Sequence, residues 1–254
     1  MSSSRSWALM CRDFIANTQR SREIIYRHFA WLTALRYQLR TQRSWETTNK
    51  PYNREYKRFY SIPEKEIALE AELSKYISKD ELECIQRKTN HAAQLLSLQS
   101  KALKSLYDEG SLDNFRFMGM HGMVRELSDH QGKSERIKNF PYPRQYATIN
   151  TIFIKLFCLL LPFALLKEFN NLNDAVSGAL KGHMVWFVIP FSVLISWIYT
   201  SLDQVGESAE NPFEGSPNDV PISQMSRSVE IDIREMLDEV DLPPAFQGQN
   251  NIIL

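Results

Sequence analysis

The sequence predicts an all-α membrane protein, in which a transmembrane helical hairpin joins a cytosolic bundle of long helices without any β-sheet. Two apolar stretches, residues 146–166 and 182–202, are each long enough for a helix to cross the roughly 30 Å of hydrocarbon in a bilayer. The first has Lys155 as its only charge, and the second has none. Elsewhere apolar residues recur at helical spacing, with no strand pattern of any length and no internal repeat.

Charge is divided between the two ends of the chain, although the net charge of the 254 residues is +0. Residues 1–60 hold twelve Lys and Arg against four Asp and Glu, whereas residues 201–254 hold two against eleven. This division predicts that the two ends meet, within one chain or between subunits. Two separately solvated faces would produce the same division.

The three cysteines, Cys11, Cys84 and Cys158, have no regular spacing. An odd number without a pattern argues against a disulfide framework and against a zinc site, and it fits a reducing cytosolic setting. The first six residues lack the basic start and apolar run of a signal peptide, so membrane insertion would depend on the internal hairpin.

Residues 6–48 are predicted to form one long amphipathic helix or two helices in line. Apolar side chains such as Trp7, Phe14, Ile25 and Leu32 recur on one face, and arginines fill the other. The apolar face would pack against other helices or lie on an anionic membrane surface.

Residues 49–63 are predicted to be a connector without a helix, because Lys50-Pro51, three tyrosines and Pro63 interrupt it. A helix is predicted to start at Pro63, since proline and acidic residues favour the first turn. Another is predicted after Ser78, which has the spacing to Glu81 of a capping box.

A strong helix is predicted over residues 90–107, where leucines recur at helical spacing, and Glu109-Gly110 is expected to end it. Ser111 or Asp113 would cap the next helix, which continues through Leu127.

The predicted membrane spans contain Pro162 and Pro190, which would act as hinges or as bends tolerated by neighbouring helices. Lys155 is costly inside a membrane span, by about 2.5–3.5 kcal/mol on insertion scales. It would either face an anion or avoid the cost by snorkelling or by pairing with an acid on a neighbouring helix. Residues 140–143 read as a stiff entry into the first span.

After the second span, residues 211–221 are predicted to form an ordered loop. Ser223 is expected to cap an acidic helix that ends at Met236 or Leu237, and the residues from Leu242 onward are expected to form a frayed tail.

Little in the sequence favours catalysis. It contains no glycine-rich phosphate loop, no His-x-x-x-His and no Gly-x-Ser-x-Gly, and the basic N-terminal region has no stacking platform for bases. We therefore expect no enzyme activity, no catalytic residue, no cofactor, no metal ion and no nucleic-acid partner. The five histidines are scattered: His28, His91, His121, His130 and His183.

Residues 140–221 resemble the bacterial branch of the bestrophin family of ion channels, and weaker similarity extends over nearly the whole chain. The resemblance is carried by three segments in their order and spacing. These are Pro141-Tyr142-Pro143-Arg144-Gln145-Tyr146 leading into residues 155–165, then Ser196-Trp197-Ile198, and then Glu207-Ser208-Ala209-Glu210-Asn211-Pro212-Phe213 followed by Asn218-Asp219-Val220-Pro221.

The resemblance implies that five helical subunits form a homopentamer around a central pore, which passively conducts chloride or small cations. It also implies a multi-pass protein of the bacterial inner membrane, in contact with the lipid bilayer, with both polar ends in the cytosol. The corresponding segments are a cytosolic helical region over 1–140, the hairpin over 141–202 and an acidic cytosolic segment over 203–254.

The family motif after the last membrane helix matches Asn211, Pro212, Phe213, Asn218 and Asp219. Animal members place a run of aspartates here that helps to bind calcium. Residues 214–219 offer only two acids, whereas calcium takes six to eight oxygen ligands. We therefore expect no calcium gate.

Family members carry another pair of membrane helices before the N-terminal helix seen here, and the second of that pair lines the neck of the pore. The given sequence starts where that pair should have ended. The chain would then be a fragment, or a non-conducting, membrane-anchored interaction protein that assembles with longer relatives.

The family also has an apolar constriction on a cytosolic helix, which corresponds to residues 90–107. Leu96, Ser100 and Leu103 share one face of that helix and are the candidates for this aperture, where an apolar ring would gate by dewetting. The leucines would equally serve as the core of the subunit.

Overall fold

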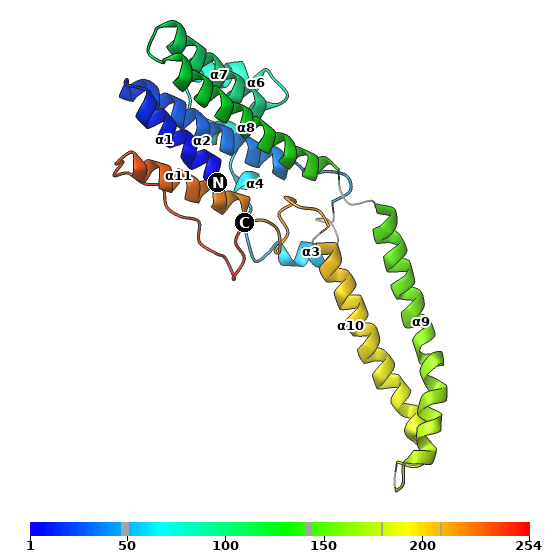
Figure 1. The fold of residues 1–254 in the computed structure, drawn as a ribbon. Helices are drawn as coiled ribbons and strands as arrows, with labels where there is room; N and C mark the ends of the chain where they lie inside the picture. Colours follow the sequence, from blue (N-terminus) through cyan, green and yellow to red (C-terminus); the bar gives the residue numbers. More distant parts are fainter. Residues whose placement is uncertain (47–50, 141–143, 179, 209) are drawn as a thin grey trace. The chain divides into compact units, whose positions relative to one another are not determined.

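The computed structural model describes residues 1–46, 51–140, 144–178, 180–208 and 210–254, and Figure 1 traces them. The described residues contain helices and loops with no strand, so the predicted all-α class is confirmed. The helices are α1 (Ser2–Phe14), α2 (Thr18–Arg40), α3 (Pro51–Tyr56), α4 (Pro63–Glu66), α5 (Leu69–Leu73), α6 (Lys79–Gln86), α7 (His91–Asp108), α8 (Asn114–Asn139), α9 (Arg144–Ala175), the 3₁₀ turn η1 (Met184–Phe187), α10 (Val188–Ser208) and α11 (Ile222–Met236).

The described chain divides into two compact units. The bundle unit consists of Met1–Phe140 together with Pro212–Leu254, and the hairpin unit consists of Pro141–Asn211. The sequence-based division at 202 differs from this grouping, because the acidic residues from Pro212 onward belong to the same unit as the N-terminal helices.

The N-terminal amphipathic region forms two helices that pack against each other, so the expectation of one helix or two in line is wrong. The chain turns because Ile15 is extended and buried, and because the Asn17 side chain accepts a hydrogen bond from the Arg20 N–H at 3.0 Å. The second helix ends at Arg40 rather than near residue 48.

The core of the bundle unit lies where α1, α2, α7, α8 and α11 meet (Figure 1). Fully burying one large apolar side chain contributes about 1.5–3 kcal/mol, so this contiguous cluster is the main source of stability in the unit. Its largest fully buried apolar members are Trp7, Ile25, Phe29, Leu73, Ile85, Leu95, Leu103, Met120, Leu127 and Ile233.

The connector contains a short helix, α3, although residues 49–63 were expected to have none. Pro51 is its first residue, a position where proline loses no intrahelical hydrogen bond. Lys50 lies outside the described residues. The predicted start at Pro63 is confirmed, but that helix is only four residues long.

The predicted helix caps in the middle of the chain are largely confirmed. The Ser78 hydroxyl accepts from the Glu81 N–H at 3.3 Å, and α7 occupies the strong helix predicted over 90–107. Asp113, rather than Ser111, caps α8 by accepting from the Arg116 N–H at 3.0 Å.

The C-terminal residues differ from their prediction in two respects. Ser223 lies inside α11 and does not cap it, because its hydroxyl donates to Glu64 Oε1 at 2.6 Å. The tail is packed rather than frayed, since Leu254 is buried with Tyr60 and Ile62, and its carbonyl accepts from the Gln224 N–H at 3.0 Å.

In the hairpin unit, α9 and α10 run side by side (Figure 1). Two helical segments are long and apolar enough to cross a membrane, Thr148–Ala175 and Met184–Ser208, of 28 and 25 residues. Pro162 lies inside α9, and Pro190 is the third residue of α10, which follows η1 directly. Residues 141–143, the predicted stiff entry, lie outside the described residues.

Candidate functional site

The hairpin exposes apolar side chains along both helices. In the most apolar windows of the two segments only 6% and 11% of the residues are buried. An exposed apolar surface of this extent is unfavourable in water and fits lipid or other membrane helices. The most exposed large side chains of the unit are Tyr146, Phe153, Leu159, Phe163, Trp186, Val193, Trp197, Leu202 and Val205.

Two pairs of aromatic rings lie between the two helices. Phe157 and Tyr199 have ring centroids 4.8 Å apart, and Phe169 and Phe191 lie 5.3 Å apart. These contacts hold the hairpin together while leaving most of its surface free.

Charged and polar groups of the hairpin gather where α9 begins and α10 ends. A cavity of about 800 Å³ opens there, lined among others by Asp203, Glu207 and Glu210, and Asn150 Nδ2 donates to Asp203 Oδ1 at 3.0 Å. Lys155 is exposed and has no ion-pair partner among the residues that the structure describes. Lys155 therefore does not offset the free-energy cost of a charge inside a membrane by pairing with an acidic residue of its own hairpin.

The loop that carries the family motif is organised by Asp219. Its carboxylate accepts from the backbone N–H groups of Phe213, Gly215 and Val220 at 2.8, 2.7 and 2.7 Å. Phe213 and Gly215 have φ values of +66° and +84°, a left-handed conformation that glycine adopts most easily. Asn218 is exposed, and Asn211 and Pro212 stand on either side of the boundary between the units.

Asp219 also belongs to a buried cluster of charges, which we name the Arg40 clasp: Arg36, Arg40, Glu64 and Asp219. Arg40 Nη1 lies 2.6 Å from Asp219 Oδ2, and Arg36 Nη1 lies 3.0 Å from Glu64 Oε1. The side chains of Arg40, Glu64 and Asp219 are only 1–2% exposed. Moving the motif loop away from α2 and α4 would separate these pairs and leave uncompensated buried charges, which is costly. The clasp therefore fixes the loop onto the two helices.

Tyr60 supports the same loop by donating from its hydroxyl to the Gly215 carbonyl at 2.9 Å. Burial, and then the negative charge of Glu214, raise the pKa of Tyr60 to about 12. Within the described residues, no three His, Cys, Asp or Glu side chains are grouped so that they could hold a metal ion.

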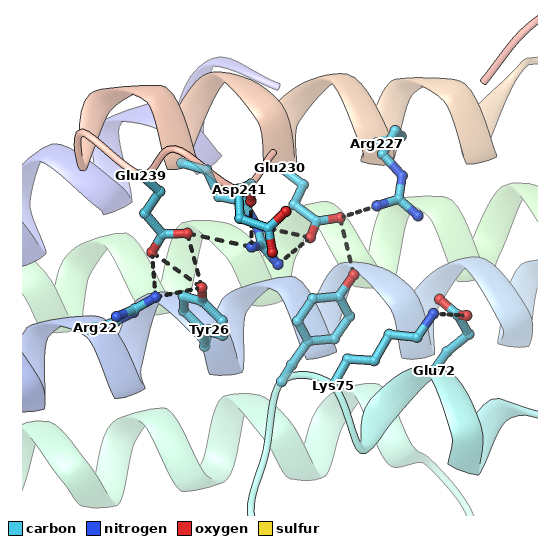
Figure 2. Close-up of polar contacts among 10 residues, drawn as sticks. Arg22, Tyr26, Glu72, Lys75, Arg227, Glu230, Glu239 and Asp241 are labelled. Carbon is cyan, nitrogen blue, oxygen red and sulfur yellow. Dashed lines mark hydrogen bonds and ion pairs between the residues drawn. The ribbon is translucent and has the colours of Figure 1, made fainter. Parts of the chain in front are cut away.

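A second charged network joins α11 to α2 and to the segment after α5 (Figure 2). Glu230 accepts from the Tyr76 hydroxyl at 3.0 Å, from Arg227 Nη1 at 3.0 Å and from Arg234 Nη2 at 2.8 Å. Burial, and then the charge of Glu230, raise the pKa of Tyr76. Because Glu230 is buried and all its neighbours donate to it, it is the centre of this network.

Glu239 continues the network beyond α11. It pairs with Arg22 at 3.1 Å and with Arg234 at 3.3 Å, and it accepts from the Tyr26 hydroxyl at 2.9 Å (Figure 2). With the Arg40 clasp and the Arg5–Asp232 pair, these contacts confirm the prediction that the basic and acidic ends meet, and they show that the ends meet within one chain.

The three aperture candidates on α7 differ in burial. Leu96 and Leu103 are 6% and 0% exposed and belong to the core of the bundle unit, as the core alternative predicted. Ser100 is half-buried, and its hydroxyl lies 3.5 Å from His121 Nε2. In the single chain the face that these residues share therefore points toward the core.

Sequence reasoning did not single out Arg36, Arg40 and Glu64, the three residues that hold Asp219 and its loop. The available signal was the spacing of Arg36 and Arg40, which places two arginines on one face of a helix beside its apolar stripe. Their acidic partners are far away in sequence, so no local pattern identifies the pairs.

The comparisons with known proteins agree with this architecture. The chain is 30% identical over 172 residues to the "Voltage-dependent anion channel-forming protein YneE" of Salmonella typhi and 28% identical over 172 residues to its Escherichia coli K12 counterpart, covering 67% of this chain and 51% of each relative. A Synechocystis protein of the same description is 26% identical over 148 residues, covering 58% of this chain and 42% of that protein. The chain thus spans about half the length of these relatives.

Among solved structures, a bacterial bestrophin homologue from Klebsiella pneumoniae matches 94% of this chain and 75% of its own, with a TM-score of 0.75 at 22% identity, which shows a shared fold. The family model described as "Bacterial/Fungal Bestrophin protein" matches residues 2–235. This chain therefore belongs to the bacterial and fungal bestrophin family.

Proposed function

We propose that this chain is a subunit of a passive ion channel, which carries chloride or small cations across the bacterial inner membrane as a homopentamer. The observation that carries the proposal is that its relatives are named anion channel-forming proteins. The exposed apolar hairpin supports it, because such a surface fits lipid and neighbouring membrane helices. The free cysteines of the bundle unit fit a cytosolic position for both polar ends.

Ion flux from liposomes tests the proposal directly. The purified chain is reconstituted, and chloride efflux is recorded under an imposed potential, with sodium efflux in parallel to decide the selectivity. Sustained flux from vesicles that hold the chain, absent from protein-free vesicles, is the expected result. Light scattering of the detergent-solubilised protein is expected to give the mass of five copies of the 29.6 kDa chain.

The competing function is a non-conducting, membrane-anchored interaction protein or channel fragment. What favours it is that the matches cover only about half of the curated relatives. Monodisperse oligomers without flux would support it and contradict the channel for this chain. The intact mass of the protein from its native membrane would then decide between two explanations. A mass larger than that of this chain would mean that the native protein is longer, and the channel function would be restored. A mass equal to that of this chain would favour a partner subunit.

The aperture candidates can be tested by chemical modification. Of the three candidates, Leu96 and Leu103 are buried and Ser100 is half-buried in the single chain, so Ser100 is the most accessible to a reagent. In a Cys84→Ser background, which removes the exposed native thiol, Ser100→Cys is expected to let a charged thiol reagent reduce the flux. Ser105→Cys, which is exposed elsewhere on the same helix, is the matched control. If the reagent reduced the flux of both variants equally, this helix would not line the pore.

Lys155 remains a candidate for either an anion-facing charge or a snorkelling one. If it faces the permeant ion, Lys155→Gln shifts the reversal potential away from that of chloride, because a positive charge along the path attracts anions. If Lys155 snorkels, the reversal potential stays unchanged while the variant still inserts into the membrane.

A further inference from the structure

A set of solvent-accessible basic and apolar side chains lies at one end of the bundle unit. The connector between α2 and α4 contributes three cations and an aromatic ring, and the end of α8 contributes two apolar side chains. We call this set the basic rim: Arg54, Lys57, Arg58, Phe59, Ile137 and Phe140. Its three apolar members are 53%, 51% and 77% exposed, in chain order. Apolar side chains that protrude beside cations are typical of surfaces that contact a membrane interface.

The cations of the rim have no partner inside the bundle unit. Arg54, Lys57 and Arg58 form no ion pair and no side-chain hydrogen bond with the residues that the structure describes. Residues 53–60 hold these three basic side chains against one acidic side chain, Glu55. The rim therefore carries positive charge that the protein itself does not compensate, and this charge favours an anionic partner.

The connector and the end of α8 belong to the same end of the unit. Glu46 forms an ion pair with Lys138, and the two side chains are only 2–3% exposed. Desolvation, and then the charge of Lys57, lower the pKa of Lys65, whereas Glu46 raises it. Glu46 therefore lies close both to the end of α8 and to the basic part of the connector.

The rim lies where the chain passes between its two units. Phe140 is the last residue of the bundle unit before the hairpin, and Ile137 lies one helical turn earlier. On the return side, Tyr60, which follows Phe59, donates from its hydroxyl to the Gly215 carbonyl at 2.9 Å. Gly215 belongs to the motif loop, with which the chain re-enters the bundle unit. Both covalent links to the hairpin therefore start beside the rim.

These links limit how far the rim can be from the membrane that the hairpin crosses. The chain runs from Phe140 to Arg144, the first residue of α9, and from Ser208, the last residue of α10, to Pro212. Each link advances four residues, which span at most about 14 Å. The rim is therefore held near the membrane surface whatever the orientation of the two units.

We propose that the basic rim binds the anionic headgroup layer of the membrane that the hairpin crosses. The three cations lie against the charged headgroups of anionic lipids, and Phe59, Ile137 and Phe140 enter the boundary between headgroups and acyl chains. This partner compensates the unpaired cations and covers the exposed apolar side chains together. The proposal requires only that the hairpin spans a membrane, and it does not depend on ion conduction.

Headgroup quenching of a dye on the reconstituted full chain tests the proposal. In a Cys84→Ser and Cys158→Ala background, in which Cys11 is buried, the dye is attached to Asn139→Cys beside the rim. The matched control is Asn114→Cys, since both asparagines are exposed and lie at opposite ends of α8, about 38 Å apart along the helix. The vesicles contain a lipid with a nitroxide on its headgroup, in either phosphatidylcholine alone or an equal mixture with phosphatidylglycerol.

Quenching of the dye at position 139 is expected to be about twofold or more stronger in the vesicles with phosphatidylglycerol. High salt should remove this excess, because it screens the attraction between cations and lipid charges. Quenching at position 114 should be the same in both kinds of vesicle. No excess at position 139, or an equal excess at both positions, would overturn the proposal.

Two double variants test which cations are responsible. Arg54→Gln with Arg58→Gln should abolish the excess quenching at position 139. Lys101→Gln with Arg116→Gln removes two exposed cations from α7 and from the start of α8, and it should keep the excess. Equal behaviour of the two double variants would overturn the proposal. Quenching between dyes that grows with the protein-to-lipid ratio and ignores lipid charge would instead assign the rim to a second copy of this chain. The assay records no ion flux, so its result is independent of whether the chain conducts.

Discussion

A tryptophan and a basic side chain that are buried in one unit of this chain have exposed counterparts in the other. In the bundle unit, Trp7 is completely buried and Arg40 is buried against its acidic partner. In the hairpin unit, Trp197 is 63% exposed and Lys155 has no ion-pair partner within the described residues. The bundle unit is completed by the far end of its own chain, whereas the hairpin unit presents the surface that lipid or other subunits would cover.

Removing one tryptophan from each unit is expected to give the largest contrast. Trp7→Ala empties part of a fully buried cluster and should lower the free energy of unfolding by about 3–5 kcal/mol. Trp197→Ala should cost about 0.5 kcal/mol or less in detergent. Urea unfolding followed by circular dichroism measures both. A loss of several kcal/mol for Trp197→Ala would instead place that side chain in a subunit interface.

Breaking a buried charge pair should cost nearly as much as the core change. Arg40→Gln leaves Asp219 buried without its cation and is expected to lower the free energy of unfolding by about 3 kcal/mol. Arg5→Gln, which breaks a half-exposed pair with Asp232, should cost about 1 kcal/mol or less. Similar losses for the two variants in the same urea experiment would mean that burial does not distinguish these pairs.

His28 is expected to make the bundle unit sensitive to acid. Its ring is fully buried between Trp7 and Trp31, with ring centroids 6.5 and 5.1 Å away, and burial lowers its pKa from 6.5 to about 3. As the pH falls below 6.5, His28 becomes protonated in the unfolded chain but stays neutral in the folded chain. The free energy of unfolding therefore decreases until the pH nears 3.

Between pH 7 and pH 5 this histidine should account for a loss of about 2 kcal/mol. His28→Leu is expected to flatten the stability curve over that range, whereas His130→Leu, at an exposed position, should leave its slope nearly unchanged. Parallel curves for the native chain and His28→Leu would contradict the prediction.

The smallest contrast concerns two glycines in the left-handed conformation. Gly215, in the motif loop, has φ +84°, and an added Cβ would lie 2.8 Å from Ile62 Cδ1, so Gly215→Ala should cost about 2 kcal/mol. Gly178, between the hairpin helices, has φ +89° with nothing within 4 Å, so Gly178→Ala should cost only the backbone strain, about 1 kcal/mol. Thermal unfolding measures how far each substitution lowers the melting temperature. Equal shifts for the two variants would mean that the contact with Ile62 adds no cost at Gly215.

Local sequence patterns predicted the helices well, because periodicity and caps act within a few residues. The cap at Ser78 and the long helices α7 and α8 are examples. The turn between α1 and α2 was missed because the apolar pattern continues through it, although Asn17 is a good cap residue. Ser223 was misassigned because its partner, Glu64, is 159 residues away in sequence.

The candidate site was harder to predict than the fold. Uneven charge predicted that the chain ends meet, but only the structure pairs Arg40 with Asp219 and Arg22 with Glu239. Leu96 and Leu103 show the converse problem. An apolar stripe on a helix has the same spacing whether it lines a pore or packs into a core, so periodicity could not choose between the two.

The pairing of the N-terminal helices with residues 212–254 has a consequence for the order of synthesis. A ribosome makes the chain in the N-to-C direction, so α1 and α2 emerge before the hairpin, and the hairpin emerges before α11. Until then, Arg40 has no Asp219 and the surface of α2 that receives α11 stays open. The bundle can therefore close only after the hairpin has been translated, and a chain arrested between the two would expose that surface to chaperones and proteases.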